Sequence, residues 1–104
     1  MELILLTVPG CPNAAAFEER LATALAGRPG LAVTRQEIAD EHTAAQAGMH
    51  GSPTLLINGT DPFAAPGRPA SLSCRLYRDD AGWIGPAPSV EALQQAITAA
   101  VGDS

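Results

Sequence analysis

The sequence predicts one α/β domain, with a sheet buried on both faces and helices on each side of it. Two apolar runs, Leu3–Val8 and Thr54–Ile57, lack the polar alternation of a half-exposed strand, so both are expected in the middle of a sheet. Stripes of apolar residues at helical spacing lie between and after these runs. A chain of 104 residues has room for one core, so residues 1–104 are expected to form a single domain.

The first half of the chain is predicted to alternate strand and helix. After the first strand, an apolar stripe through Phe17–Leu25 predicts a helix that stops at Gly27–Gly30. Charged residues within Leu31–Ile38 predict a strand at or near the edge of the sheet. A short helix is expected over Ala39–Gly48, with Asp40 near its start.

The middle of the chain is predicted to add a strand and a hairpin. A loop rich in proline over Thr60–Ala70 follows the strand Thr54–Ile57. Alternation over Leu72–Tyr77 favours another strand, with Leu72 and Leu76 on its apolar face. The turn Asp79–Gly82 would allow Trp83-Ile84 to complete a hairpin.

The last element is a helix over Val90–Val101, capped by Ser89 and ended by Gly102. The order of elements is therefore β-α-β-α-β-β-α. It predicts a mixed four-stranded sheet with the strand order 2-1-3-4, flanked by helices on both faces.

Charge and composition narrow the function. Six arginines stand against 11 acidic residues, the net charge is −5, and no basic cluster occurs, so nucleic acid and membrane surfaces are not expected partners. The first apolar run lacks a positive leader and ends at Pro9, which is a poor signal peptide. The expected location is therefore the cytoplasm, where two cysteines are typically reduced or catalytic rather than joined in a structural disulfide.

Cys11 is the sharpest chemical feature, because it stands between a buried strand and a helix. Pro12 suits the first helical position, so Cys11 is the predicted N-cap, near the free N–H groups at the helix start. Those donors favour a thiolate, the reactive form in disulfide exchange, peroxide reduction or soft-metal capture. The alternative is a small buried apolar residue.

The segment Ser52-Pro53-Thr54 precedes the second apolar strand, where proline is tolerated at the first position. With the loop Cys11-Pro12-Asn13, it resembles the thioredoxin-like superfamily over nearly the whole chain. More closely, the sequence is similar to small thioredoxin-like proteins with Cys-Pro-Asn or selenocysteine-Pro-Asn in this loop, some of them labelled alkylmercury lyase. They share Asp61-Pro62-Phe63 and Cys74-Arg75-Leu76-Tyr77.

The resemblance implies a thiol-dependent oxidoreductase with Cys11 as the nucleophile and a cis Pro53 beside it. It also implies that Pro12, Asn13, Ser52 and Pro53 bind the substrate. Phe63 either lines the same groove or pins its loop to the core. The expected partners are a low-molecular-weight thiol and a protein disulfide or peroxide, with no cofactor.

The position three residues after Cys11 is Ala14, so the neighbouring resolving thiol of dithiol thioredoxins is missing. A mixed disulfide on Cys11 needs either an outside thiol or Cys74. Cys74 is a candidate resolving thiol, or a core residue that shares a face with Leu72 and Leu76.

Other readings of the same residues stay open. Cys11 and Cys74 together are the candidate ligands of a mercury-handling protein. A non-catalytic thioredoxin-like binding module is a further alternative. His50 lies three residues before Pro53 and is a candidate neighbour of the thiol, whereas His42 is expected in solvent. No metal site is expected, because Cys11, His50 and Cys74 lack the paired spacing of structural zinc ligands.

Overall fold

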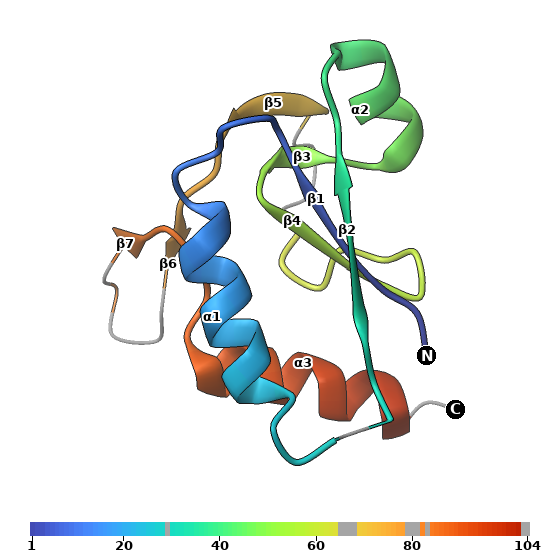
Figure 1. Cartoon of the computed structure of the whole chain (residues 1–104), viewed down its shortest axis with the longest axis vertical. Helices are drawn as coiled ribbons and strands as arrows, with labels where there is room; N and C mark the ends of the chain where they lie inside the picture. The colour runs from blue at the N-terminus through green and yellow to red at the C-terminus, as the bar shows by residue number, and fades with distance from the viewer. Residues whose placement is uncertain (29, 65–68, 79–81, 83, 103–104) are drawn as a thin grey trace.

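The fold is a mixed α/β arrangement of short elements (Figure 1). The computed structural model describes residues 1–28, 30–64, 69–78, 82 and 84–102, without the side chain of Cys74. Its elements are β1 (Leu3–Thr7), α1 (Ala14–Ala24), β2 (Val33–Glu37), α2 (Glu41–Ala47), β3 (His50–Ser52), β4 (Thr54–Ile57), β5 (Ser71–Cys74), β6 (Tyr77–Arg78), β7 (Ile84–Gly85) and α3 (Val90–Gly102). No helix in these ranges has the length and apolar character to cross a bilayer.

β1 is the centre of a three-stranded sheet with the order β2-β1-β4 among the described residues. It runs parallel to β2, with Leu5 opposite Arg35, and antiparallel to β4, with Leu5 opposite Leu55. The predicted central position of the first strand and the predicted edge position of the second are both confirmed. The predicted central position of Thr54–Ile57 is wrong for the described residues, because β4 lies at the other edge of these three strands. Four of the five β2 residues are exposed, as expected at the edge of a sheet.

Helices cover both faces of this sheet, as the sequence predicts. α1 and α3 pack against each other on one face, and α2 lies at the opposite end of the molecule from α3 (Figure 1). Successive residues of a strand point to opposite faces of the sheet, so β1 and β4 each contribute side chains to two cores. The larger core includes Leu3, Leu5, Phe17, Leu21, Leu55, Ile57, Leu93 and Ile97. The smaller one consists of Leu6, Ile38, Ala44, Met49 and Leu56.

The fourth predicted strand does not join this sheet. Its first half forms β5, which pairs in parallel with β3 rather than with β4, so the predicted four-stranded order 2-1-3-4 is wrong for the described residues. Gly51 makes this pairing possible. A Cβ at residue 51 would lie 2.9 Å from the Arg75 Cβ and 3.1 Å from the Ser73 carbonyl oxygen. β5 therefore approaches β3 this closely only because residue 51 has no side chain.

The chain also changes register after β5. Arg75 is 3% exposed and Tyr77 6%, whereas Leu76 is 60% exposed. The predicted apolar face through Leu76 is therefore wrong beyond β5, because a shift of one residue exchanges the buried and exposed sides of a strand. Leu76, one of the two apolar neighbours that would share a buried face with Cys74, is therefore exposed.

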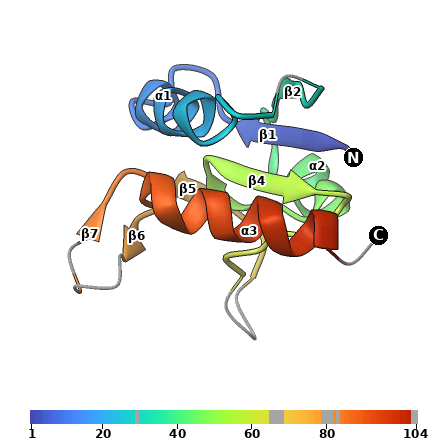
Figure 2. The ribbon, with the colours of Figure 1, turned by 90° about the horizontal axis from the view of Figure 1, so that it is seen from below.

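The predicted hairpin is present, and it lies beside the start of α3 (Figure 2). β6 and β7 pair in antiparallel fashion, with Tyr77 opposite Gly85. Of the predicted turn residues 79–82 only Gly82 lies within the described residues, and Trp83 lies outside them. α3 begins at the predicted cap, where the Ala92 N–H donates to the Ser89 hydroxyl over 3.1 Å.

α2 also has the predicted start and end. The Asp40 carboxylate is the N-cap, and it accepts from the Thr43 N–H over 2.7 Å and from the Thr43 hydroxyl over 3.0 Å. Gly48 ends the helix with a positive φ of 78°. The bonds from Thr43, the backbone N–H first, lower the pKa of Asp40 from its ordinary value of 3.8.

We expect the cap to make the stability of the protein depend on pH in acid. A folded-state pKa below the unfolded value means that the ionised Asp40 stabilises the fold above pH 3.8, and that this contribution is lost as the pH falls through the lower, folded pKa. The thermal midpoint of Asp40→Asn should therefore lie below that of the wild type at neutral pH, and the two should converge in acid. A difference that stays constant from pH 7 to well below 3.8 would contradict this account.

Candidate functional site

Cys11 lies on the turn that joins β1 to α1, and its free thiol belongs to a half-buried side chain. The Cys11 N–H donates to the Val8 carbonyl oxygen over 3.1 Å. Gly10 supplies a φ of +72° within this turn, a value that a residue with a side chain rarely adopts. The turn therefore places the thiol at the end of the central strand, where it is open to small reagents.

Cys11 is not the N-cap of α1, which corrects the prediction. The N-cap is Asn13, and the first helical backbone bond runs from the Phe17 N–H to the Asn13 carbonyl oxygen over 3.1 Å. Pro12 and Asn13 form a turn closed by a 3.4 Å bond from the Ala14 N–H to the Cys11 carbonyl oxygen. Proline suits the second position of such a turn, so Pro12 is part of the turn and the helix begins after it. The Asn13 side chain makes no capping bond to α1.

Ser52 and Pro53 lie directly beside this turn, and the peptide bond between them is cis. The Val8 N–H donates to the Ser52 hydroxyl over 3.1 Å, which ties the residue before Pro53 to the strand end that carries the Cys11 turn. Ser52 is 0% exposed and Pro53 is buried. Of the other predicted substrate residues, Pro12 is exposed, and Asn13 and Phe63 are half-buried. Their contact with a substrate stays a prediction.

A buried ion pair between Arg75 and Asp61 lies close to Ser52 and Pro53. The Arg75 guanidinium donates to the Asp61 carboxylate over 2.6 Å, and the two side chains are 2% and 4% exposed. It also donates to the Phe63 carbonyl oxygen over 2.6 Å and to the Thr54 hydroxyl over 3.3 Å. Asp61 in turn accepts from the Phe63 N–H over 2.8 Å. The pair therefore joins the loop after β4 to the segment after β5.

Tyr77 extends this cluster to the proline. Its hydroxyl donates to the Pro53 carbonyl oxygen, and the Arg75 guanidinium carbon lies 4.6 Å from the centre of its ring. The rings of Phe17 and Phe63 meet the Tyr77 ring edge-on, with centres 5.6 Å and 5.8 Å away. Phe63 thus packs against the core, as one of its two predicted roles requires.

The predicted second thiol is placed only by its backbone. Cys74 stands opposite Ser52 in the β3–β5 register, so its backbone lies beside the residue that precedes Pro53. Its side chain lies outside the described residues, and its role as resolving thiol or metal ligand stays a prediction. Among the side chains that the structure describes, no group of three or more His, Cys, Asp or Glu could hold a metal ion.

The two histidines lie in different surroundings. His42 is exposed on α2. His50 is half-buried in β3, and its Nδ1 lies 3.4 Å from the Pro69 carbonyl oxygen. A cavity of about 340 Å³ borders His50, Ser71 and Ser73.

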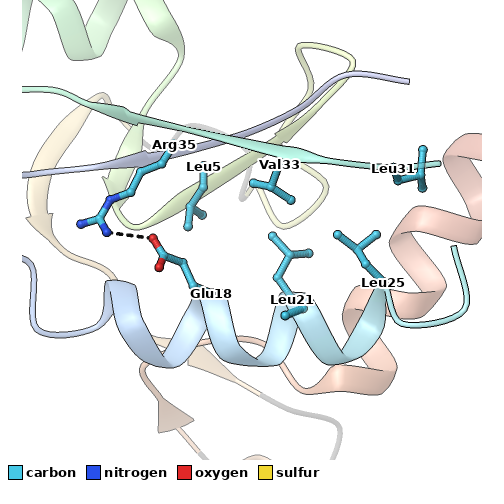
Figure 3. A pocket seen from close by; sticks show the side chains of 8 residues that line it. Leu5, Glu18, Leu21, Leu25, Leu31, Val33 and Arg35 are labelled. Atoms are coloured by element: carbon cyan, nitrogen blue, oxygen red, sulfur yellow. Dashed lines mark ion pairs between the residues drawn. The ribbon is translucent and has the colours of Figure 1, made fainter. Parts of the chain in front are cut away.

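An apolar cavity lies elsewhere, between α1 and the β1–β2 edge (Figure 3). It measures about 520 Å³, and the Glu18–Arg35 ion pair of 2.9 Å closes one end of it. Its lining residues are Leu5, Glu18, Leu21, Ala22, Leu25, Leu31, Val33 and Arg35. None of them is a predicted site residue, so this cavity is separate from the thiol.

Sequence reasoning missed the roles of Arg75, Thr54 and Tyr77. Arg75 and Tyr77 belong to one quoted motif, and Asp61 and Phe63 belong to the other. The two motifs meet in one buried cluster, a connection that the spacing of 14 residues between Asp61 and Arg75 does not reveal. The sequence did contain a signal for this contact. A lone Arg stands in an apolar strand pattern and an Asp stands before Pro-Phe, and these two residues have opposite charges that can pair.

Comparisons of the chain with models of protein families, with curated proteins and with solved structures gave no match.

Proposed function

We propose that the chain is a thioredoxin-like domain that catalyses thiol–disulfide exchange with Cys11 as the nucleophile. The observation that carries the proposal is the 3.1 Å bond from the Val8 N–H to the Ser52 hydroxyl, because it joins the Cys11 turn to the residue before Pro53. The parallel β1–α1–β2 unit, the antiparallel β4 and the helices on both faces support the fold assignment. The half-buried, free thiol supports the role of Cys11.

The chemistry needs only thiols and a disulfide. The Cys11 thiolate attacks one sulfur of a disulfide, a mixed disulfide forms on Cys11, and the other substrate sulfur leaves as a thiolate. The start of α1 lies close to Cys11 along the chain, and the N-terminal end of a helix favours negative charge. A second thiolate then attacks the mixed disulfide and restores Cys11.

The second thiolate must come from outside the Cys11 turn, because residue 14 is alanine. A low-molecular-weight thiol fits this requirement and makes the reaction a monothiol cycle. Cys74 is the alternative source, and the register that sets it opposite Ser52 favours it. Release by Cys74 would leave an intramolecular disulfide, which an outside thiol must then reduce.

Cys11→Ser should abolish catalysis, because the hydroxyl is a poor nucleophile toward sulfur. The measurement is the glutathione-dependent reduction of 2-hydroxyethyl disulfide, for which the expected rate of the variant equals that of glutathione alone. Cys74→Ser is the matched control. If glutathione releases the mixed disulfide, Cys74→Ser should keep its activity. If Cys74 releases it, the variant should accumulate the mixed disulfide on Cys11, which intact-mass spectra detect.

Equal rates for the wild type and Cys11→Ser would contradict the proposal. Stoichiometric Hg²⁺ binding by Cys11 and Cys74 without disulfide turnover would instead favour mercury handling. A Cys11 thiol that iodoacetamide labels no faster than an unstructured cysteine peptide, in a protein without turnover, would favour a binding module.

A further inference from the structure

β3 is contacted on two sides by other described parts of the chain. On one side of it the Val8 N–H at the end of β1 donates to the Ser52 hydroxyl over 3.1 Å. On the other side β5 runs parallel to it, with His50 opposite Ser71 and Ser52 opposite Cys74. The backbone edge of β3 that faces β5 is therefore used by the chain itself, and the Ser52 hydroxyl joins the same strand to the Cys11 turn.

The carbonyl groups on either side of the Pro53 ring are also occupied. The Arg75 N–H donates to the Ser52 carbonyl oxygen over 2.9 Å, and the Tyr77 hydroxyl donates to the Pro53 carbonyl oxygen. Both donors belong to the segment that follows β5. The buried bonds from Arg75 to Asp61 and to the Phe63 carbonyl oxygen hold that segment in place.

This arrangement bears on the size of the substrate. An extended polypeptide docks beside a strand by adding to its edge, which requires unpaired N–H and C=O groups there. In this chain β5 already uses the edge that leads to Pro53. A small disulfide needs no such edge, because it has only to reach the half-buried Cys11 thiol.

We infer that β5, fixed by the Arg75–Asp61 pair, is a built-in cover of the β3 edge that restricts Cys11 to disulfides of low-molecular-weight thiols. The inference rests on the proposed exchange activity and names its substrate class. Asp61 acts in it as a positioning residue, since it reaches β3 only through Arg75.

The test uses two probes with the same leaving group, the mixed disulfides of thionitrobenzoate with cysteamine and with a cysteine-containing decapeptide. The Cys11 thiolate attacks the cysteamine or peptide sulfur, that sulfur becomes bound to Cys11, and yellow thionitrobenzoate is released. All proteins carry Cys74→Ser, so that Cys11 supplies the only thiol. Each rate is divided by that of glutathione with the same probe.

The normalised rate of the wild-type site should be at least about tenfold higher for cysteamine than for the decapeptide, because the paired edge of β3 leaves an extended chain no place to lie beside the half-buried thiol. Asp61→Asn should narrow this ratio by raising the peptide rate, because the cover is held less firmly. Leu93→Ala, on the core-facing side of α3, is the matched control for lost stability, and it should leave the ratio unchanged.

A wild-type ratio near one, or a preference for the peptide, would overturn the cover while leaving the exchange activity intact. An Asp61→Asn protein in which both rates fall together would overturn the role of the ion pair in selectivity and leave it a structural contact. Rates no higher than that of glutathione with both probes would remove the proposed function, and the cover with it. Circular dichroism at the assay temperature confirms that each variant is folded.

Discussion

Asp61→Ala is expected to lower the free energy of unfolding by about 3–5 kcal/mol, the usual effect of removing one partner from a buried ion pair. Its partner Arg75 is 2% exposed at the side chain and would keep a charge that water cannot reach. The Phe63 N–H would also lose its acceptor. The measurement is the urea midpoint with an unchanged slope, which shows that stability rather than the unfolded state has changed.

The chain offers a matched control in its other ion pair. Glu18 and Arg35 are 2.9 Å apart, but their side chains are 40% and 45% exposed. Glu18→Ala should therefore cost less than about 1 kcal/mol, because water screens an exposed pair. Equal losses for Asp61→Ala and Glu18→Ala would show that burial does not set the strength of the Arg75 pair.

Phe17→Ala is the second large expected effect, with a loss of about 3–5 kcal/mol from the free energy of unfolding. Phe17 is 0% exposed and lies where α1, β1 and α3 meet, with its ring edge-on to Tyr77. The substitution leaves a cavity under α1 and removes the aromatic contact. Thermal and urea unfolding of the variant measure the loss.

Phe17→Leu serves as the control for that prediction. It keeps most of the apolar volume and should cost distinctly less than alanine, because the cavity that remains is smaller. If both variants unfold at the same urea concentration, packing at residue 17 is looser than the edge-on contact of Phe17 with Tyr77 indicates.

Local patterns predicted the elements whose residues carry their own signal. β4 is an unbroken apolar run, and all four of its residues are buried. α3 has a cap at Ser89 and an apolar stripe through Leu93 and Ile97, both 0% exposed. Each of these signals lies within a few residues of the element that it predicts, so tertiary contacts did not need to be known.

β3 could not be predicted in the same way. Its sequence His50-Gly51-Ser52 has no apolar alternation, and it is a strand because β5 lies against it. The burial of Arg75 depends on Asp61 and on the Phe63 carbonyl oxygen, which reach it only after the loop following β4 has folded back. The alternation over Leu72–Tyr77 set Arg75 opposite the apolar face of Leu72 and Leu76, because such a pattern takes account of side-chain type and not of distant partners.

The candidate site was predictable in outline. The sequence alone pointed to Cys11 and to Ser52-Pro53, and the Val8–Ser52 bond brings them together. It placed the start of α1 too early, because Pro12 suits both the first turn of a helix and the turn that precedes it. The carbonyl oxygens of Ser52 and Pro53 accept hydrogen bonds from Arg75 and Tyr77, which the sequence pattern assigned to a separate strand.

The close approach at Gly51 has a consequence for how the sequence can drift. Its φ is +109°, and a methyl group there would overlap the Arg75 Cβ. By contrast, Gly48 also has a positive φ, of 78°, but faces open space, so an asparagine can replace it at small cost. Two glycines three residues apart thus differ in their freedom to mutate. The reason lies more than 20 residues away, in a strand that narrows the choice at position 51 to a single amino acid.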